Sequence, residues 1–242
     1  MFYAGKPVKL EDSNTHGISG ESNLSPPAEL FIVEGDSAAG AVAGVRAVQY
    51  QAVLPMQGKP LNAHKAKALK VMANPLFSQL SIALGVPMID SYDVNINTSD
   101  AAVQSQLANL RFSTINCLFD PDADGIHCGA LLLMFFARWM RPLLASGRIH
   151  LIRAPLFEMV AHRSDGEILL AHPDSVARCD DIKAAWIALG ALNINIHHYR
   201  GLGSINADVL WRTCVAPDTR QSTGVGLGAA QAAIDVFAPQ RR

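Results

Sequence analysis

Three aspartates alternate at the end of a buried apolar segment, a spacing that suits the binding of a divalent cation. Asp120, Asp122 and Asp124 lie within the sequence FDPDADG, residues 119–125. TINCL before them is typical of a buried strand, and IHCGALLLMFFARWM after them is typical of a helix. Because three like charges so close together repel one another, we expect a cation between them. Mg²⁺ prefers such hard oxygen ligands and needs only one or two carboxylates beside a substrate phosphate.

The same motif has three other interpretations. D-x-D-x-D-G opens an EF-hand calcium loop, but the twelfth position of that loop needs a glutamate, and this chain has Leu131 there. A strand followed by D-x-D also resembles the haloacid-dehalogenase-like phosphotransferases, although those usually have Thr or Val where Asp124 stands. The aspartates could simply cap a helix, which explains one or two of them but not three. The Mg²⁺ site is the interpretation that fits best.

A second acidic residue follows another predicted strand. Glu34 comes directly after ELFIV, residues 29–33, and leads into a helix through a turn at Gly35. Parallel strands end at the same edge of a sheet, and ligands bind at that edge. The sequence therefore predicts that Glu34 meets Asp120 and Asp122 around one ion.

These positions require a fold that brings the ends of separate strands together. Short apolar strands alternate with helical segments along the chain, which predicts an α/β protein with a mostly parallel sheet flanked by helices. We expect a hairpin over residues 154–171. We predict the other strands at residues 29–33, 51–55, 114–119, 148–152 and 194–199, and helices at 37–45, 64–73, 76–85, 101–112, 126–144, 181–189 and 206–214.

The charged residues are unevenly distributed although the formal net charge is only -1. No Asp or Glu lies between Ser37 and Ile89, a stretch that contains Arg46, Lys59 and Lys65. A basic surface of this kind can attract a phosphate backbone even on a nearly neutral protein, because the backbone responds to the local field.

The cysteines and the apolar segments indicate the cellular compartment of the protein. Its 4 cysteines are far apart with no C-x-x-C pair, which argues against zinc and disulfides and favours reduced thiols. The longest apolar run, GALLLMFFA, stops at Arg138 and is too short to span a bilayer. The first residues lack the apolar centre of a signal peptide. We therefore expect a cytoplasmic protein without membrane contacts.

Several blocks of the sequence resemble one known family. ELFIVEGDSA followed by DPDADG resembles the Toprim domain, a Rossmann-like Mg²⁺-binding fold of topoisomerases and primases. QAVLPMQGKPLNAHKA, GIHCGALLLMFF, GRIHLIRAPLFEM and YRGLGSINADVLWRTCVAPDTR resemble, in order and spacing, the B-type component of bacterial type IIA topoisomerases, gyrase and topoisomerase IV. This similarity covers about residues 28–220.

The resemblance implies a role for each acidic residue. Glu34 matches the catalytic glutamate of the family, which binds metal and acts as an acid or base during religation. Asp120 and Asp122 match its metal-ligand pair, also assigned to catalysis, and Asp124 matches the third acid, often given to a second metal. The implied cofactor is Mg²⁺, with Mn²⁺ or Ca²⁺ as substitutes.

The resemblance also implies contacts with DNA. Lys59 and Asn62, in the sequence GKPLN, match positions that touch DNA near the cleavage site. Arg46 and Lys65 lie in the same acid-free stretch, and we predict them as further DNA-binding residues. Gln57 and Gly129 stand where the family usually has basic residues, which weakens the expected affinity for DNA.

The implied activity is half of a DNA cleavage and religation centre. In this family the attacking tyrosine is carried by an A-type partner, so the chain is expected to act only with that partner. We expect an arm or linker at residues 1–27, a Toprim domain at 28–160, and a smaller C-terminal α+β tail at 161–242. The ATPase domain of an ATP-hydrolysing type II topoisomerase is missing and no ATP site is predicted, so the chain is either a fragment or a Toprim-only homologue.

Two other functions remain open from the residues. The chain could be a catalytically weak or silent Toprim module that binds DNA or assists assembly, which the residues at Gln57 and Gly129 favour. A haloacid-dehalogenase-like phosphotransferase is the third possibility. This interpretation predicts that the chain hydrolyses small phosphoesters and that the activity depends on Asp120.

Overall fold

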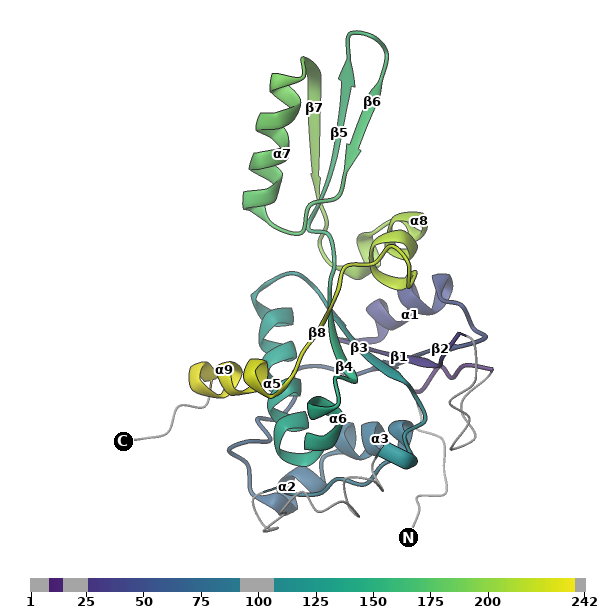
Figure 1. The fold of residues 1–242 in the computed structure, drawn as a ribbon, viewed down its shortest axis with the longest axis vertical. Helices are drawn as coiled ribbons and strands as arrows, with labels where there is room; N and C mark the ends of the chain where they lie inside the picture. The colour runs from purple at the N-terminus through teal and green to yellow at the C-terminus, as the bar shows by residue number, and fades with distance from the viewer. Residues whose placement is uncertain (1–8, 15–25, 92–106, 238–242) are drawn as a thin grey trace.

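The computed structural model describes residues 9–14, 26–91 and 107–237, and its elements form two units (Figure 1). The larger unit, called the body here, is built on a five-stranded sheet with the strand order β2-β1-β3-β4-β8. Its strands are β1 (Glu29–Val33), β2 (Gln51–Pro55), β3 (Thr114–Phe119), β4 (Ile149–Arg153) and β8 (Ser222–Gly224). The first four are parallel and β8 is antiparallel. The predicted parallel α/β architecture is confirmed.

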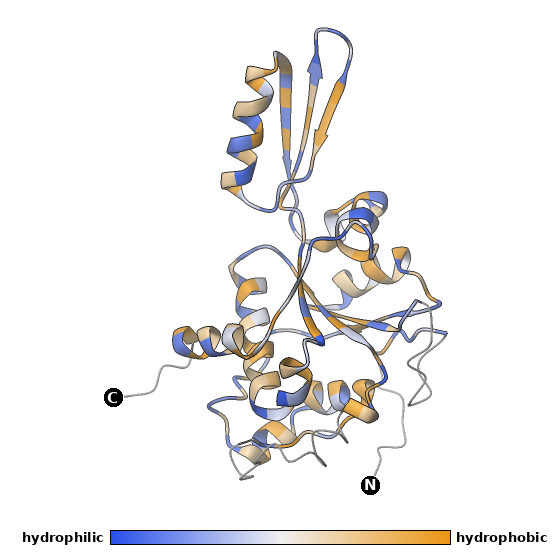
Figure 2. Ribbon diagram, in the orientation of Figure 1, coloured by the Kyte–Doolittle hydropathy of each residue, from blue (hydrophilic) through white to orange (hydrophobic). Residues whose placement is uncertain are grey.

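Both faces of this sheet are covered by helices, because each central strand is apolar on both sides. In β1, Leu30 and Ile32 belong to the larger core cluster, while Phe31 and Val33 belong to the core on the opposite face. The larger core packs under α3 (Pro75–Leu84) and α5 (Ala123–Trp139), and the opposite core under α1 (Asp36–Val45) and α8 (Ala207–Leu210). Figure 2 shows apolar residues along these strands and helices.

The helix predicted over residues 126–144 is two helices in the structure. α5 ends at Trp139, and α6 (Arg141–Ala145) follows after Met140, whose φ is -139°. Pro142 has no N–H and cannot continue the hydrogen bonding of α5. The carbonyl groups left at the end of α5 accept bonds from a neighbouring segment: Ile89 N–H donates to Trp139 and Ser91 N–H to Arg138.

The helices predicted at residues 64–73 and 76–85 are present as α2 and α3 (Pro75–Leu84). α2 covers only Ala68–Met72, because the backbone carbonyls just before it bond to Arg138 rather than to a helical turn. α3 lies close to the predicted limits: Asn74 caps its start and Gly85, with φ 74°, ends it. The first half of the helix expected at 101–112 lies outside the described residues, and of the described half only residues 107–108 are helical before the chain turns. Residues 9–14, in the predicted arm, contact the body through paired backbone bonds between Glu11 and Val53.

The smaller unit projects from the body and has its own core. It consists of β5 (Phe157–Arg163), β6 (Ile168–Ala171), α7 (Val176–Ala188) and β7 (Ala191–His198), with the antiparallel order β6-β5-β7. We call it the projecting unit. The predicted hairpin is confirmed. α7 starts five residues before the prediction, where the Ser175 side chain accepts a bond from the Arg178 N–H. β5 crosses residue 160, and the domain division made there stays a prediction.

The chain then returns to the body. After η1 (Leu202–Ser204), α8 continues into a π-helical turn, η2 (Trp211–Val215), and together they replace the helix predicted at 206–214. The last helix, α9 (Leu227–Phe237), packs against α5 through Ala233, Ile234 and Phe237. None of the described helices combines the length and apolarity needed to cross a membrane.

Candidate metal centre

The sheet brings Glu34 and Asp120 to the same edge. β1 and β3 are neighbouring parallel strands in which Val33 lies opposite Leu118. Glu34 follows β1 directly, and Asp120 follows the last residue of β3. The predicted meeting of the two acidic strand ends therefore has its geometric basis in the strand register.

The acidic residues of this edge interact electrostatically. Burial raises the pKa of Glu34, and the charges of Asp120, Asp122 and Asp124 raise it further, against a smaller lowering by Lys59. Burial also raises the pKa of Asp120, and the charge of Asp122 adds to it. These shifts express the cost of holding four carboxylates near one another with partial loss of water.

Each of the three aspartates has a partner within the chain. Asp120 Oδ1 accepts a hydrogen bond from Leu202 N at 2.8 Å. Asp122 caps α5 by accepting from Gly125 N at 2.8 Å. Asp124 Oδ1 is 2.7 Å from Lys59 Nζ, and this hydrogen bond lowers the pKa of Asp124. The turn is thus organised by contacts within the chain itself.

Two glycines allow the backbone to pass close to Asp120. A Cβ atom at Gly125 would lie 2.0 Å from the carbonyl oxygen of Asp120, so no larger residue fits there without rearrangement of the turn. Gly201 has φ 148°, and a Cβ atom there would lie 2.7 Å from Asp120 Oδ2. Only glycine combines this backbone conformation with so close an approach.

The donor chemistry of this edge fits Mg²⁺. All four groups are carboxylates, the hard oxygen ligands that Mg²⁺ prefers, and the raised pKa of Glu34 and Asp120 shows a deficit of positive charge. Within the described residues, however, no three acidic, His or Cys side chains are arranged as a ready ligand shell. Asp120, Asp122 and Asp124 instead contact Leu202, Gly125 and Lys59. The ligand set Glu34, Asp120 and Asp122 stays a prediction.

Of the predicted DNA-binding residues, Lys59 lies at the acidic edge and the loop that follows it carries two more. Asn62 Oδ1 accepts from Lys65 N at 3.1 Å, which closes a turn and leaves the Lys65 side chain exposed. Arg138 fixes the backbone of this loop, since its guanidinium donates to the carbonyl oxygens of Ala63, at 2.9 Å, His64 and Ala66. The loop therefore presents its basic side chains from a fixed backbone.

Arg46 is not brought to this edge. It lies at the opposite end of α1 from Glu34, and the ten residues of that helix span about 15 Å. Its side chain is only 7% exposed, donates to the Gln51 carbonyl oxygen and lies 3.8 Å from Glu11. These contacts hold the guanidinium within the chain, away from the acidic edge.

Sequence reasoning missed several groups that shape the centre. The Leu202 N–H that binds Asp120 comes from a segment 82 residues further along, and nothing in the local pattern indicates it. Asp36 accepts hydrogen bonds from Lys9, at 2.7 Å, and from Gln57, at 2.9 Å. Gln57 itself has φ 61°, so its side chain is directed by an uncommon backbone conformation.

Comparison with known proteins agrees with this geometry. The Toprim domain family matches residues 29–154, a range that contains both acidic strand ends. The DNA gyrase B protein of Thermotoga maritima is 34% identical over 232 residues, covering 96% of this chain and 32% of that protein. The DNA gyrase B protein of Mycolicibacterium smegmatis is 33% identical over 236 residues, covering 96% and 31%.

A third relative is the novobiocin-sensitive DNA gyrase B protein of Streptomyces niveus, 35% identical over 240 residues, with 97% of this chain and 31% of that protein covered. The chain thus spans about a third of the length of the curated relatives it matches. It belongs to the Toprim domain family and is homologous to the gyrase B protein along nearly all of its length.

Proposed function

We propose that this chain is the metal-binding half of a DNA cleavage and religation centre of the type IIA topoisomerase kind. The attacking tyrosine would come from an A-type partner subunit, and a DNA substrate implies a cytoplasmic location. The observation that carries the proposal is the coupling of Glu34 with Asp120 and Asp122 at the ends of two neighbouring parallel strands, with Lys59 beside them.

The tyrosines of the chain support a nucleophile from elsewhere. Tyr199 is 3% exposed and donates its hydroxyl hydrogen to Glu158 at 2.9 Å. Burial raises its pKa, which further disfavours a phenolate. Tyr50 immediately precedes β2, whereas the acidic edge lies at the far ends of the strands. Tyr3 and Tyr92 lie outside the described residues.

The residues at the edge have distinct roles in this proposal. Glu34, Asp120 and Asp122 would hold Mg²⁺, with Asp124 available for a second ion. Bound Mg²⁺ would polarise a phosphoryl oxygen and stabilise the leaving 3′ oxygen. Lys59 would hold the backbone phosphate, and Asn62 and Lys65 would position the strand. The resemblance to the family also gives Glu34 the role of an acid or base, which would give a proton to the 3′ oxygen during cleavage and take it back during religation.

The direct test is formation of a covalent complex between DNA and the A-type subunit of the same organism. The chain, that subunit, duplex DNA and Mg²⁺ are mixed and denatured, and the tyrosine-linked DNA is counted. We expect Glu34→Gln to lower the yield at least about a hundredfold, since catalysis by a positioned acid or base contributes about this much. Glu167→Gln, an exposed carboxylate in the projecting unit, is the matched control and should leave the yield unchanged. Adduct formation that survives Glu34→Gln would contradict the proposal.

The internal partners of the three aspartates favour a second candidate, a Toprim module that binds DNA without chemistry. Each of these carboxylates has one partner from the chain itself: Leu202 N–H, Gly125 N–H or Lys59. Calorimetric titration with Mg²⁺ separates the two functions. Heat that is abolished by Asp122→Asn would support the cleavage centre. Retained DNA binding without any Mg²⁺ binding would establish the silent module instead.

A further inference from the structure

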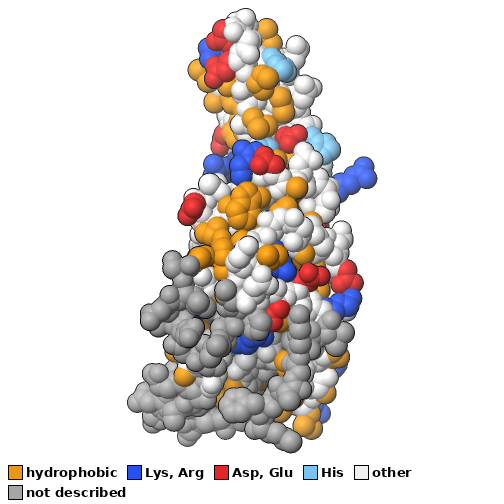
Figure 3. Space-filling view, turned by 90° about the vertical axis from the view of Figure 1, so that its right-hand side faces the viewer, with side chains coloured by type: hydrophobic (Ala, Val, Ile, Leu, Met, Phe, Trp, Pro, Cys, Tyr) orange, Lys and Arg blue, Asp and Glu red, His pale blue; other side chains and the backbone are white. Residues whose placement is uncertain are grey.

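A cleft of about 260 Å³ lies where the projecting unit meets the body. Its walls come from β4, η2 and the segment before β8 on the side of the body, and from α7 with the residues before it on the other side. Figure 3 shows charged and histidine side chains gathered at the level where the two units meet. The polar lining includes Arg153, His172, Asp174, Arg178 and Gln221, and none of the four acidic residues of the metal centre. The cleft is therefore a polar space of its own.

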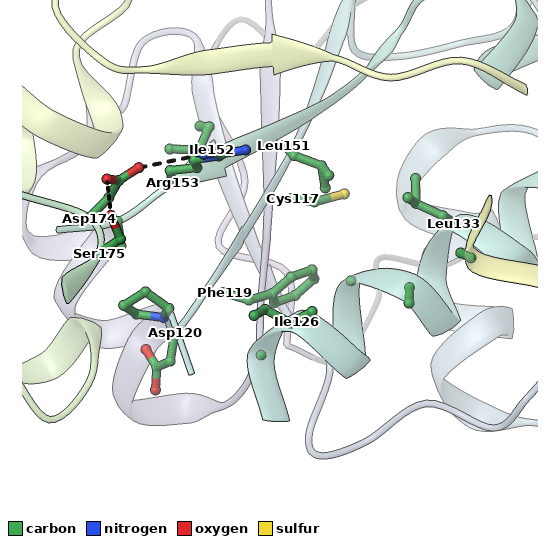
Figure 4. A pocket seen from close by; sticks show the side chains of 16 residues that line it. Cys117, Phe119, Asp120, Ile126, Leu133, Leu151, Ile152, Arg153, Asp174 and Ser175 are labelled. Carbon is green, nitrogen blue, oxygen red and sulfur yellow. Dashed lines mark hydrogen bonds and ion pairs between the residues drawn. The ribbon is translucent and has the colours of Figure 1, made fainter. Parts of the chain in front are cut away.

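Two arginines of this cleft have hydrogen-bond donors that no described residue accepts. Arg153 Nη1 lies 3.7 Å from Asp174 (Figure 4), and Arg178 Nε lies 4.0 Å from the same carboxylate. Both distances exceed that of an N–H···O hydrogen bond, so Asp174 attracts the two guanidinium groups without binding their N–H groups. The side chains of Arg153 and Arg178 are 75% and 62% exposed. The cleft thus has one positive charge in excess and five N–H donors on each guanidinium.

His172, a third lining residue, also lacks a partner. Both nitrogens of its ring are buried, and neither has a hydrogen bond within the described part of the chain. Burial lowers the pKa of His172, so the ring is neutral at pH 7 and has one N–H donor. A buried polar group without a partner costs free energy, which a ligand with acceptor oxygens would recover.

We infer that this cleft is a binding site for a single phosphate group. Arg153 contacts it from the body, and Arg178 and His172 from the projecting unit. A tetrahedral anion with four oxygens can accept from donors on separate walls, and the guanidinium fork matches phosphate geometry. The volume is below the roughly 300–1,000 Å³ of sites for larger ligands, which suits a single small group.

The phosphate has two possible sources, the free ion and the DNA backbone. The second is considered because Arg153 lies opposite Phe119 in the parallel pair β3–β4, and Phe119 directly precedes Asp120. Neighbouring strands are about 4.8 Å apart, so this end of β4 adjoins the acidic edge. The inference does not depend on the proposed cleavage activity, because the lining residues have no role in the metal centre.

Calorimetric titration of the full chain with inorganic phosphate tests the site, with a chelator present and the ionic strength held constant. We expect one saturable site with a dissociation constant on the order of 1 mM. Arg178→Gln should weaken phosphate binding about tenfold, since a charge-assisted hydrogen bond is lost. Arg141→Gln, an exposed arginine at the start of α6 outside the cleft, is the matched control and should bind like the wild type. No saturable binding to the wild type, or an equal loss in Arg141→Gln, would overturn the inference.

His172→Phe provides a second variant that keeps the shape of the ring. The nitrogens it removes have no partner among the described residues, so the fold loses no hydrogen bond seen there. We expect phosphate binding to weaken roughly three- to tenfold, the effect of one neutral donor. Wild-type phosphate affinity in His172→Phe or in Arg178→Gln would contradict the assignment.

Binding of a short DNA duplex, measured at several salt concentrations in the same chelator, identifies the source. If the cleft takes a backbone phosphate, Arg178→Gln lowers duplex affinity and reduces the slope of log affinity against log salt by about 1. If it takes the free ion, duplex affinity is the same in both proteins while phosphate affinity still differs. Either result supports a phosphate site, whereas equal affinities of wild type and Arg178→Gln for both ligands would refute it.

Discussion

Asp120 is the residue on which the contacts of the candidate centre converge. Its Oδ1 accepts from Leu202, its carbonyl oxygen lies against Gly125, and its Oδ2 faces Gly201. Burial raises the pKa of this carboxyl although one backbone N–H stabilises its charged form. An ion would therefore meet a carboxylate that is already held between two backbone segments and still lacks charge compensation.

The raised pKa of Glu34 gives a prediction about stability without metal. The folded chain binds a proton at Glu34 more tightly than the unfolded chain does. The stability contributed by this group is thus present below pH 4.5, the ordinary pKa, and is lost as the pH rises through the folded pKa. Glu34→Gln should remove this loss and stabilise the metal-free protein at pH 7 by up to about 1 kcal/mol, a small value because solvent screens a partly exposed carboxylate.

Urea unfolding in the presence of a chelator, repeated at several pH values, measures this effect. Asp124→Asn serves as the contrasting variant. The pKa of Asp124 is lowered by Lys59, so the contribution of this carboxylate is lost as the pH falls rather than as it rises. If Glu34→Gln were less stable than the wild type at pH 7, the acidic edge would not be a site of repulsion.

At the scale of elements, the apolar patterns of the sequence correctly predicted the central strands of the sheet. ELFIV and TINCLF are apolar on both faces, and the structure has strands there with the parallel order that brings Glu34 and Asp120 together. The same patterns missed the break of α5 at Met140 and the short α2. The break follows from Pro142, a local signal that apolar periodicity does not register. The late start of α2 depends on bonds from Arg138 to carbonyl groups far away in the sequence, about which periodicity carries no information.

Arg138 illustrates how one residue joins several elements. It lies on α5, forms a buried ion pair with Asp90 at 2.6 Å, and donates to carbonyl groups of the loop that carries Lys65. We expect Arg138→Met to destabilise the fold by about 3–5 kcal/mol, since it leaves a buried carboxylate without its main partner. Urea unfolding measures the loss, and DNA affinity should fall with it as the loop loses its support.

The double variant Arg138→Met with Asp90→Leu tests the cause. Removing both charges should recover much of the lost stability, because no unpaired ion then remains in the interior. Arg212→Met, which breaks an exposed pair with Asp208 at 2.7 Å, is the matched control and should have a far smaller effect. Equal losses in Arg138→Met and Arg212→Met would mean that burial of the pair contributes nothing.

At the scale of the molecule, the described chain forms two units that do not share a core. Met159, Ala161 and Trp186 form the core of the projecting unit, separate from the cores on the two faces of the body's sheet. The C-terminal segment, by contrast, is fixed to the body by Arg220, whose buried guanidinium lies 2.7 Å from Glu29 and contacts the Val215 carbonyl oxygen. Glu29 and Arg220 thus join two parts of the body that are far apart in the sequence, and the residues of the projecting unit lie between these two in the sequence.

This arrangement predicts that the projecting unit can be removed without unfolding the body. Tyr199 N–H donates to the Leu156 carbonyl oxygen at 2.9 Å, so the two ends are close enough to be joined by a short glycine linker replacing residues 158–197. We expect the shortened chain to unfold cooperatively near the temperature of the full chain, because each core is a separate cooperative unit. Truncation at residue 215 removes Arg220 and should lower the melting temperature markedly, since Glu29 is then buried without its cation. Calorimetry distinguishes the outcomes. A shortened chain without a cooperative transition would show that the body needs the projecting unit to fold.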